Sequence, residues 1–130
     1  VLCLVTYEQG RHVQALRDAE LGLALAAPGS IERARVLHAL ASLRWRVTRD
    51  ATGLDALLDE ALAIAEREDH PGIQASVLAL RGFIAGARRG GEPEAEALQR
   101  EALALWQRQG NRHLVNSGLY NLAVRAAARR

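Results

Sequence analysis

Apolar residues recur along this chain with the spacing of one face of an α-helix. Residues 53–68 carry one apolar stripe at i, i+3, i+7, i+8 and i+11, made by Leu54, Leu57, Ala61, Leu62 and Ala65. Residue types that end helices separate such stretches at 28–30, 69–72, 90–93 and 110–111. The pattern therefore predicts an all-α fold with no strand, and seven helices over residues 1–9, 12–27, 31–48, 53–68, 72–88, 93–109 and 112–128.

The apolar pattern also repeats at a longer period. Segments 14–25, 53–64 and 94–105 align without gaps, at offsets of 39 and 41 residues. A second register has an offset of 41 throughout and consists of Leu37, Leu78 and Leu119, each followed four residues later by Ala41, Gly82 or Ala123. Two registers with one period indicate a helical repeat array.

Each repeat is predicted to be a pair of helices that buries its apolar face only by stacking on its neighbours. We expect a single array over residues 1–130, with units of about 1–29, 30–70, 71–110 and a partial unit 111–130. Helix axes approach to about 8 Å only where side chains are small. The small residues Ala41, Gly82 and Ala123 are therefore expected to lie where paired helices cross.

These residues resemble the tetratricopeptide repeat (TPR) motif. Ala41, Gly82 and Ala123 look like the small residue at the eighth position of its first helix. Ala95 and Ala102 look like the small residues seven apart in its second helix, as do Ala15 and Gly22. The stretch Glu8–Gln9–Gly10 is similar to the turn between the two helices.

The resemblance implies a right-handed superhelix of antiparallel helix pairs that acts as a binding scaffold. The period is longer than the usual TPR length of about 34 residues. Long, degenerate repeats of this kind are similar to those of bacterial MalT-like and antibiotic-regulator ATP-dependent transcriptional activators. The function so implied is protein or peptide binding within a signalling or transcriptional regulator. Two alternatives stay open, namely sensing of a small-molecule effector and self-association into a homo-oligomer through the terminal helices.

Composition and charge narrow the class of partner. All 17 basic residues are Arg, the formal net charge is only +2, and acidic residues alternate with basic ones. A nucleic-acid surface needs basic residues concentrated on one face, so we expect no direct contact with nucleic acid. Abundant Ala and Arg without Lys suggests a bacterial source, and the absence of Met suggests a piece of a larger protein.

Residue types that carry catalysis or bind metals are scattered. Cys3 is the only cysteine, and His12, His38, His70 and His113 have no spacing that places two ligands on one helix face. We therefore expect no enzyme activity, no cofactor and no metal, with His70 and His113 as solvent-exposed loop residues. No apolar run reaches the ~18 residues of a membrane span. A cytoplasmic protein without membrane contact is expected.

The TPR resemblance implies which residues line a binding groove, because the first helix of each pair faces it. The groove residues so implied are Arg35, His38, Ser42, Trp45, Arg46, Ser76, Phe83, Ser117, Tyr120 and Asn121. Aromatic and Arg side chains are common anchors at interfaces. The alternative interpretation is that Trp45 and Phe83 pack between helices. Trp106 is expected to pack at a helix end.

Overall fold

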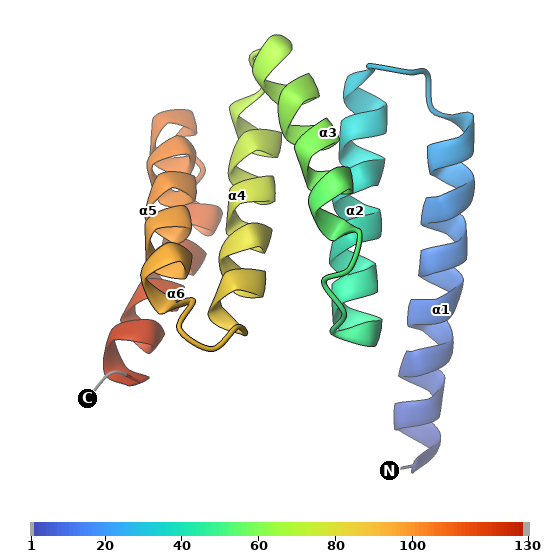
Figure 1. Cartoon of the computed structure of the whole chain (residues 1–130), viewed down its shortest axis with the longest axis horizontal. Helices are drawn as coiled ribbons and strands as arrows, with labels where there is room; N and C mark the ends of the chain where they lie inside the picture. The colour runs from blue at the N-terminus through green and yellow to red at the C-terminus, as the bar shows by residue number, and fades with distance from the viewer. Residues whose placement is uncertain (1, 129–130) are drawn as a thin grey trace. The chain divides into compact units, whose positions relative to one another are not determined.

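The computed structural model describes the backbone of residues 2–128 and the side chains of residues 10–128. Figure 1 shows the described backbone as helices joined by short turns. Residues 2–128 form six helices and no strand: α1 (Leu2–Leu25), α2 (Ile31–Thr48), α3 (Leu54–Arg67), α4 (Pro71–Gly86), α5 (Glu92–Gln109) and α6 (Arg112–Ala128). The prediction of an all-α fold is confirmed.

The predicted number of helices is wrong, because α1 is one continuous helix. A turn was expected at Glu8–Gln9–Gly10, and the backbone there is helical. A single glycine inside a helix costs only about 1 kcal/mol relative to alanine, which neighbouring helix formers such as Gln9 and Gln14 offset. Gly10, Arg11 and His12 are exposed, so the helix can continue through these positions without an apolar residue to bury.

The other predicted helix boundaries agree with the structure because local signals mark them. The Ser30 hydroxyl accepts a hydrogen bond from the Arg33 N–H at 3.1 Å and caps α2. Proline stands in the first turn of α4 and of α5, where its missing N–H removes no helical bond. His70 was expected in solvent, but its Nδ1 accepts from the Ile73 N–H at 3.2 Å and caps α4.

The cap on α2 gives a direct prediction. Ser30→Ala removes the acceptor for the Arg33 N–H and is expected to lower the free energy of unfolding by about 0.5–2 kcal/mol. Urea denaturation followed by far-UV circular dichroism measures the change. Ser42→Ala is the matched control, since Ser42 lies inside α2, where alanine is the better helix former. An equal loss in both variants would contradict the capping role.

The chain divides into two compact units, an N-terminal unit (Val1–Ile64) and a C-terminal unit (Ala65–Arg130), and the division falls inside α3. In the N-terminal unit α1 packs on α2. Arg33 of α2 binds both carboxylate oxygens of Glu60 of α3, at 2.8 and 3.1 Å. This hydrogen-bonded pair raises the pKa of Arg33. Such a bidentate pair links α2 to α3 at the surface.

In the C-terminal unit α5 packs against both α4 and α6. Its core contains Ala75, Leu78, Ala102 and Trp106, with Leu98, Leu105, Leu114 and Val115 packed against them. Trp106 is buried, so the prediction that it packs at a helix end is confirmed.

The close approach predicted at Gly82 is present. A Cβ atom on Gly82 would lie 2.9 Å from Gln99 Cγ and 3.3 Å from the carbonyl oxygen of Ala95. Gly118 of α6 has a similar role, because its added Cβ would lie 3.2 Å from Leu103 Cδ1. Ala41 is buried as expected, whereas Ala123 is exposed.

Candidate functional site

The groove residues expected on α2 differ in exposure. Arg35 and Arg46 are exposed, and His38 and Ser42 are half-buried. Trp45 is only 8% exposed, and the guanidinium of Arg49 lies 5.5 Å from the centre of its ring. These contacts favour the interpretation that Trp45 packs between helices, so it is a poor candidate for an open binding surface.

The groove residues expected in the C-terminal unit are more accessible. Phe83 on α4 is 45% exposed and Tyr120 on α6 is 69% exposed. Ser76, Ser117 and Asn121 are half-buried. The structure brings Phe83 and Asn121 to the wall of one cavity, which neither Ser76, Ser117 nor Tyr120 lines.

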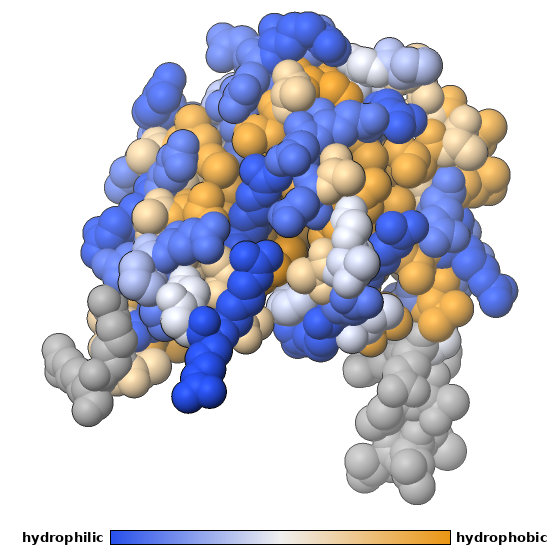
Figure 2. Space-filling view, viewed as in Figure 1, coloured by the Kyte–Doolittle hydropathy of each residue, from blue (hydrophilic) through white to orange (hydrophobic). Residues whose placement is uncertain are grey.

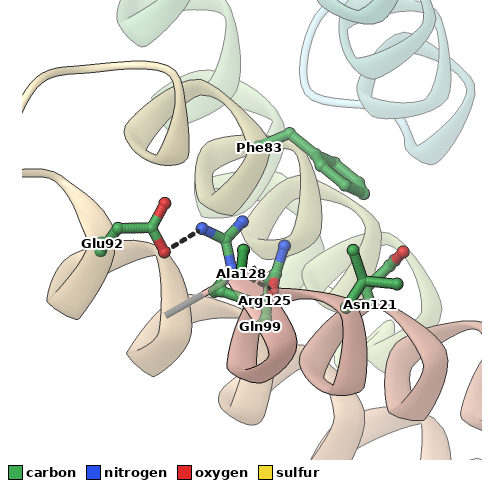
Figure 3. Close-up of a pocket in the computed structure, with 7 residues that line it drawn as sticks. Phe83, Glu92, Gln99, Asn121, Arg125 and Ala128 are labelled. Carbon is green, nitrogen blue, oxygen red and sulfur yellow. Dashed lines mark hydrogen bonds and ion pairs between the residues drawn. The ribbon is translucent and has the colours of Figure 1, made fainter. Parts of the chain in front are cut away.

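This cavity, called the α5 cavity below, lies over α5 between α4 and α6. Its volume is about 390 Å³, and its lining comes from all three helices: Phe83, Glu92, Gln99, Asn121, Val124, Arg125 and Ala128. Figure 3 shows the arrangement, with Phe83 across the space from Arg125 and Gln99. Phe83 and Val124, the latter 50% exposed, are large apolar side chains that remain open to solvent. Ligand pockets usually span about 300–1,000 Å³ and combine apolar walls with a few polar groups.

Three polar side chains are linked along one side of the α5 cavity. Arg125 Nη1 lies 2.6 Å from Glu92 Oε2, and Arg125 Nε donates a hydrogen bond of 3.1 Å to Gln99 Oε1 (Figure 3). Gly86 gives the guanidinium room, because an added Cβ there would lie 2.8 Å from Arg125 Nη1. Arg125 of α6 is thus tied to α5 by two charge-assisted hydrogen bonds, one to Glu92 and one to Gln99.

The side-chain amide of Gln99 is buried, and its NH₂ group makes no hydrogen bond with the described residues. Gln99 is only 4% exposed, and its Nε2 has no hydrogen-bond partner among the described residues. The buried indole Nε1 of Trp106 is the other such atom in the described part of the chain. Leaving a buried donor without a partner costs about 1–3 kcal/mol. Such a donor beside a cavity is a point where a ligand acceptor gains a hydrogen bond.

Sequence reasoning missed Glu92, Gln99 and Arg125, although the repeat contained a signal for two of them. Gln99 is the polar member of a buried stripe on α5. In the two registers of the repeat, Gln99 and Arg125 stand where the other copies have apolar residues. The matching residues are Ala19 and Leu58 for Gln99, and Leu43 and Ile84 for Arg125. Gln99 and Arg125 are polar in this copy of the repeat only, and they contact one another, which makes this position a candidate for a specialised site.

The chemistry available at the α5 cavity is that of binding. It offers an apolar wall, a buried amide donor and an ion pair. No three His, Cys, Asp or Glu side chains among the described residues are grouped so as to hold a metal ion. None of the helices described is long and apolar enough to cross a bilayer. Figure 2 shows charged and polar residues interspersed with apolar ones on the visible face.

Similarity to a protein of known function could indicate which class of ligand the α5 cavity binds. Comparison of the chain with protein-family models, with curated proteins and with solved structures found no match. The likeness to the TPR motif therefore rests on the repeated residues alone.

Proposed function

We propose that this chain is a TPR-like helical scaffold that binds a segment of a partner protein, as part of a bacterial signalling or transcriptional regulator. The α5 cavity is the binding site in this proposal. The repeat registers support the TPR-like scaffold, and the Ala- and Arg-rich composition supports a bacterial source.

One observation carries the proposal: half-exposed apolar side chains from two helices flank a cavity with a polar floor. Phe83 and Val124 are the apolar anchors, and Gln99 and Arg125 line the same cavity. Tyr120, one helical turn before Val124, extends the exposed apolar surface along α6. Interfaces gain most of their affinity from a few aromatic or apolar anchors surrounded by polar groups.

A peptide suits this surface because it carries apolar side chains and polar main-chain groups at a fixed spacing. An apolar side chain would bury against Phe83 and Val124, and the adjoining main chain would present its carbonyl to the cavity floor. Helix-lined grooves commonly recognise protein segments through such apolar anchors.

Selection of peptides from a random-sequence display library on the full chain tests this proposal. We expect the selected peptides to bind with a Kd that rises at least about tenfold in the double variant Phe83→Ala with Val124→Ala, since each truncation removes apolar contact area. Fluorescence polarisation of the labelled peptides measures the Kd.

The matched control removes two exposed apolar side chains of α1, with Val13→Ala and Leu21→Ala. These changes delete similar apolar area outside the α5 cavity and are expected to leave the Kd unchanged. An equal loss in the control, or full affinity in the Phe83 and Val124 variant, would exclude the α5 cavity as the peptide site.

The volume of the α5 cavity also favours a second candidate, a small-molecule effector. A volume of about 390 Å³ falls in the range of small-molecule pockets. A metabolite that raises the melting temperature of the chain, while no library peptide binds, would favour this candidate, because a ligand of the folded state stabilises it.

A further inference from the structure

We infer that the α5 cavity recognises an uncharged carbonyl group next to an apolar group, with Gln99 Nε2 as the donor. This inference rests on the proposed function and specifies what the bound segment presents at the cavity floor. A main-chain amide carbonyl beside an aliphatic side chain has this chemistry.

The orientation of the Gln99 amide is fixed by its neighbour. Arg125 carries only donors, so the atom of Gln99 that faces Arg125 Nε must be the oxygen, at 3.1 Å. The other half of the amide is then the NH₂ group. Figure 3 shows this nitrogen on the side of Gln99 that faces Phe83. Arg125 therefore holds Gln99 as a donor toward the cavity.

The charge balance at the cavity floor favours a neutral ligand. Among the residues that the structure describes, Arg125 is the one cation that lines the α5 cavity, and it is matched by Glu92 at 2.6 Å. A carboxylate placed beside Gln99 would add an unbalanced negative charge against Phe83 and Val124. Burying an ionised group without a counter-charge is costly, whereas a carbonyl needs only the hydrogen bond.

Phe83 lies at both spaces that Gln99 lines. Phe83, Gln99 and Asn121 line the α5 cavity and also a second, narrower space of about 10 Å³. That space holds about one water-sized group, which is the size of a carbonyl oxygen. Because Phe83 is half-exposed and lines both spaces, we expect a change of its rotamer to be needed for a ligand to reach the buried Gln99 Nε2.

Three small molecules with one aliphatic skeleton test the inference on the full chain. They are 4-methylpentanamide, 4-methylpentanoate and 4-methylpentylamine, which present a neutral carbonyl, a carboxylate and a cation without an acceptor. Titrations at pH 7 are followed by the NMR signals of the Gln99 side-chain amide. We expect the amide to bind in the millimolar range, as suits so small a ligand. The carboxylate and the amine are expected to bind more weakly by about 2- to 10-fold or more.

Two variants isolate the donor. Gln99→Glu keeps an oxygen for Arg125 and turns the NH₂ group into an acceptor, so 4-methylpentanamide, followed by ligand-observed NMR, should lose at least about tenfold in affinity. Gln107→Glu, an exposed residue of the same helix, is the matched control and should keep the wild-type Kd. The double variant Gln99→Leu with Arg125→Ile restores the apolar residues of the other repeats. It should stay folded and lose binding of the amide.

Each opposite result overturns the inference. These results are a carboxylate that binds as tightly as the amide, full affinity in Gln99→Glu, or a titration that leaves the Gln99 amide signals unmoved. Library peptides that still depend on Phe83 and Val124 would show in that case that the proposed function holds and that its polar contact lies elsewhere. If binding of the amide does not depend on Gln99 and binding of the library peptides does not depend on Phe83 and Val124, the proposed function is excluded as well.

Discussion

Trp106→Ala is expected to lower the free energy of unfolding of the C-terminal unit by about 3–5 kcal/mol. The indole is 7% exposed and packs with Ala75, Leu78 and Ala102. The void cannot be refilled easily, because Ala75, Ala102 and Gly118 have no side chain that could extend into it. A domain of this size has a total stability of only about 3–10 kcal/mol, so the loss is a large part of it. Urea denaturation followed by far-UV circular dichroism measures the change.

Two variants separate the lost volume from other effects of the substitution. Trp106→Phe keeps most of the apolar contact and removes an indole N–H that has no partner among the described residues, so its cost should be smaller. Tyr120→Ala removes an aromatic side chain from an exposed position of α6 and should change stability by no more than about 0.5 kcal/mol. Equal losses in Trp106→Ala and Tyr120→Ala would contradict the central place of Trp106 in the core.

The helices could be predicted where their ends are determined by neighbouring residues. Ser30 and the prolines of α4 and α5 act within one turn of their own position, and a sequence displays such signals directly. The prediction of a helix end near Gly10 was wrong, because a glycine can stand at a helix end or inside a helix, and the residue type alone does not distinguish the two. Whether the chain turns there depends on interactions beyond the neighbouring residues. The arrangement of successive helix pairs depends in the same way on contacts between distant residues, and local pattern does not specify it.

The candidate site was predicted in part. Phe83 and Asn121 were identified through the groove positions of the TPR resemblance, and both line the α5 cavity. Trp45 was also included, yet it is buried, because exposure depends on what packs around a side chain. Gln99 on α5 and Arg125 on α6 are 26 residues apart in the sequence, so a local pattern does not connect them. Their pairing becomes visible in the repeat only once the contact between them is known.

Gly82→Leu is expected to lower the free energy of unfolding of the C-terminal unit by about 1–3 kcal/mol through overpacking. The first added carbon alone would lie 2.9 Å from Gln99 Cγ and 3.6 Å from Leu98 Cβ. Gln99 cannot swing away freely, since Arg125 holds its amide oxygen. Replacing glycine inside a helix returns about 1 kcal/mol of helix propensity, which offsets only part of the loss. Thermal and urea denaturation of the full chain measure the balance.

Gly10→Leu is the matched control, because Gly10 also lies inside a helix and no described atom lies within 4 Å of the Cβ that would be added there. Here only the gain in helix propensity remains, so this variant should be unchanged or more stable. A wild-type melting temperature for Gly82→Leu would contradict the close crossing of α4 and α5. Since Gln99 lies against Gly82, the same variant should also weaken binding of 4-methylpentanamide, which links the crossing of the helices to the position of the donor in the α5 cavity.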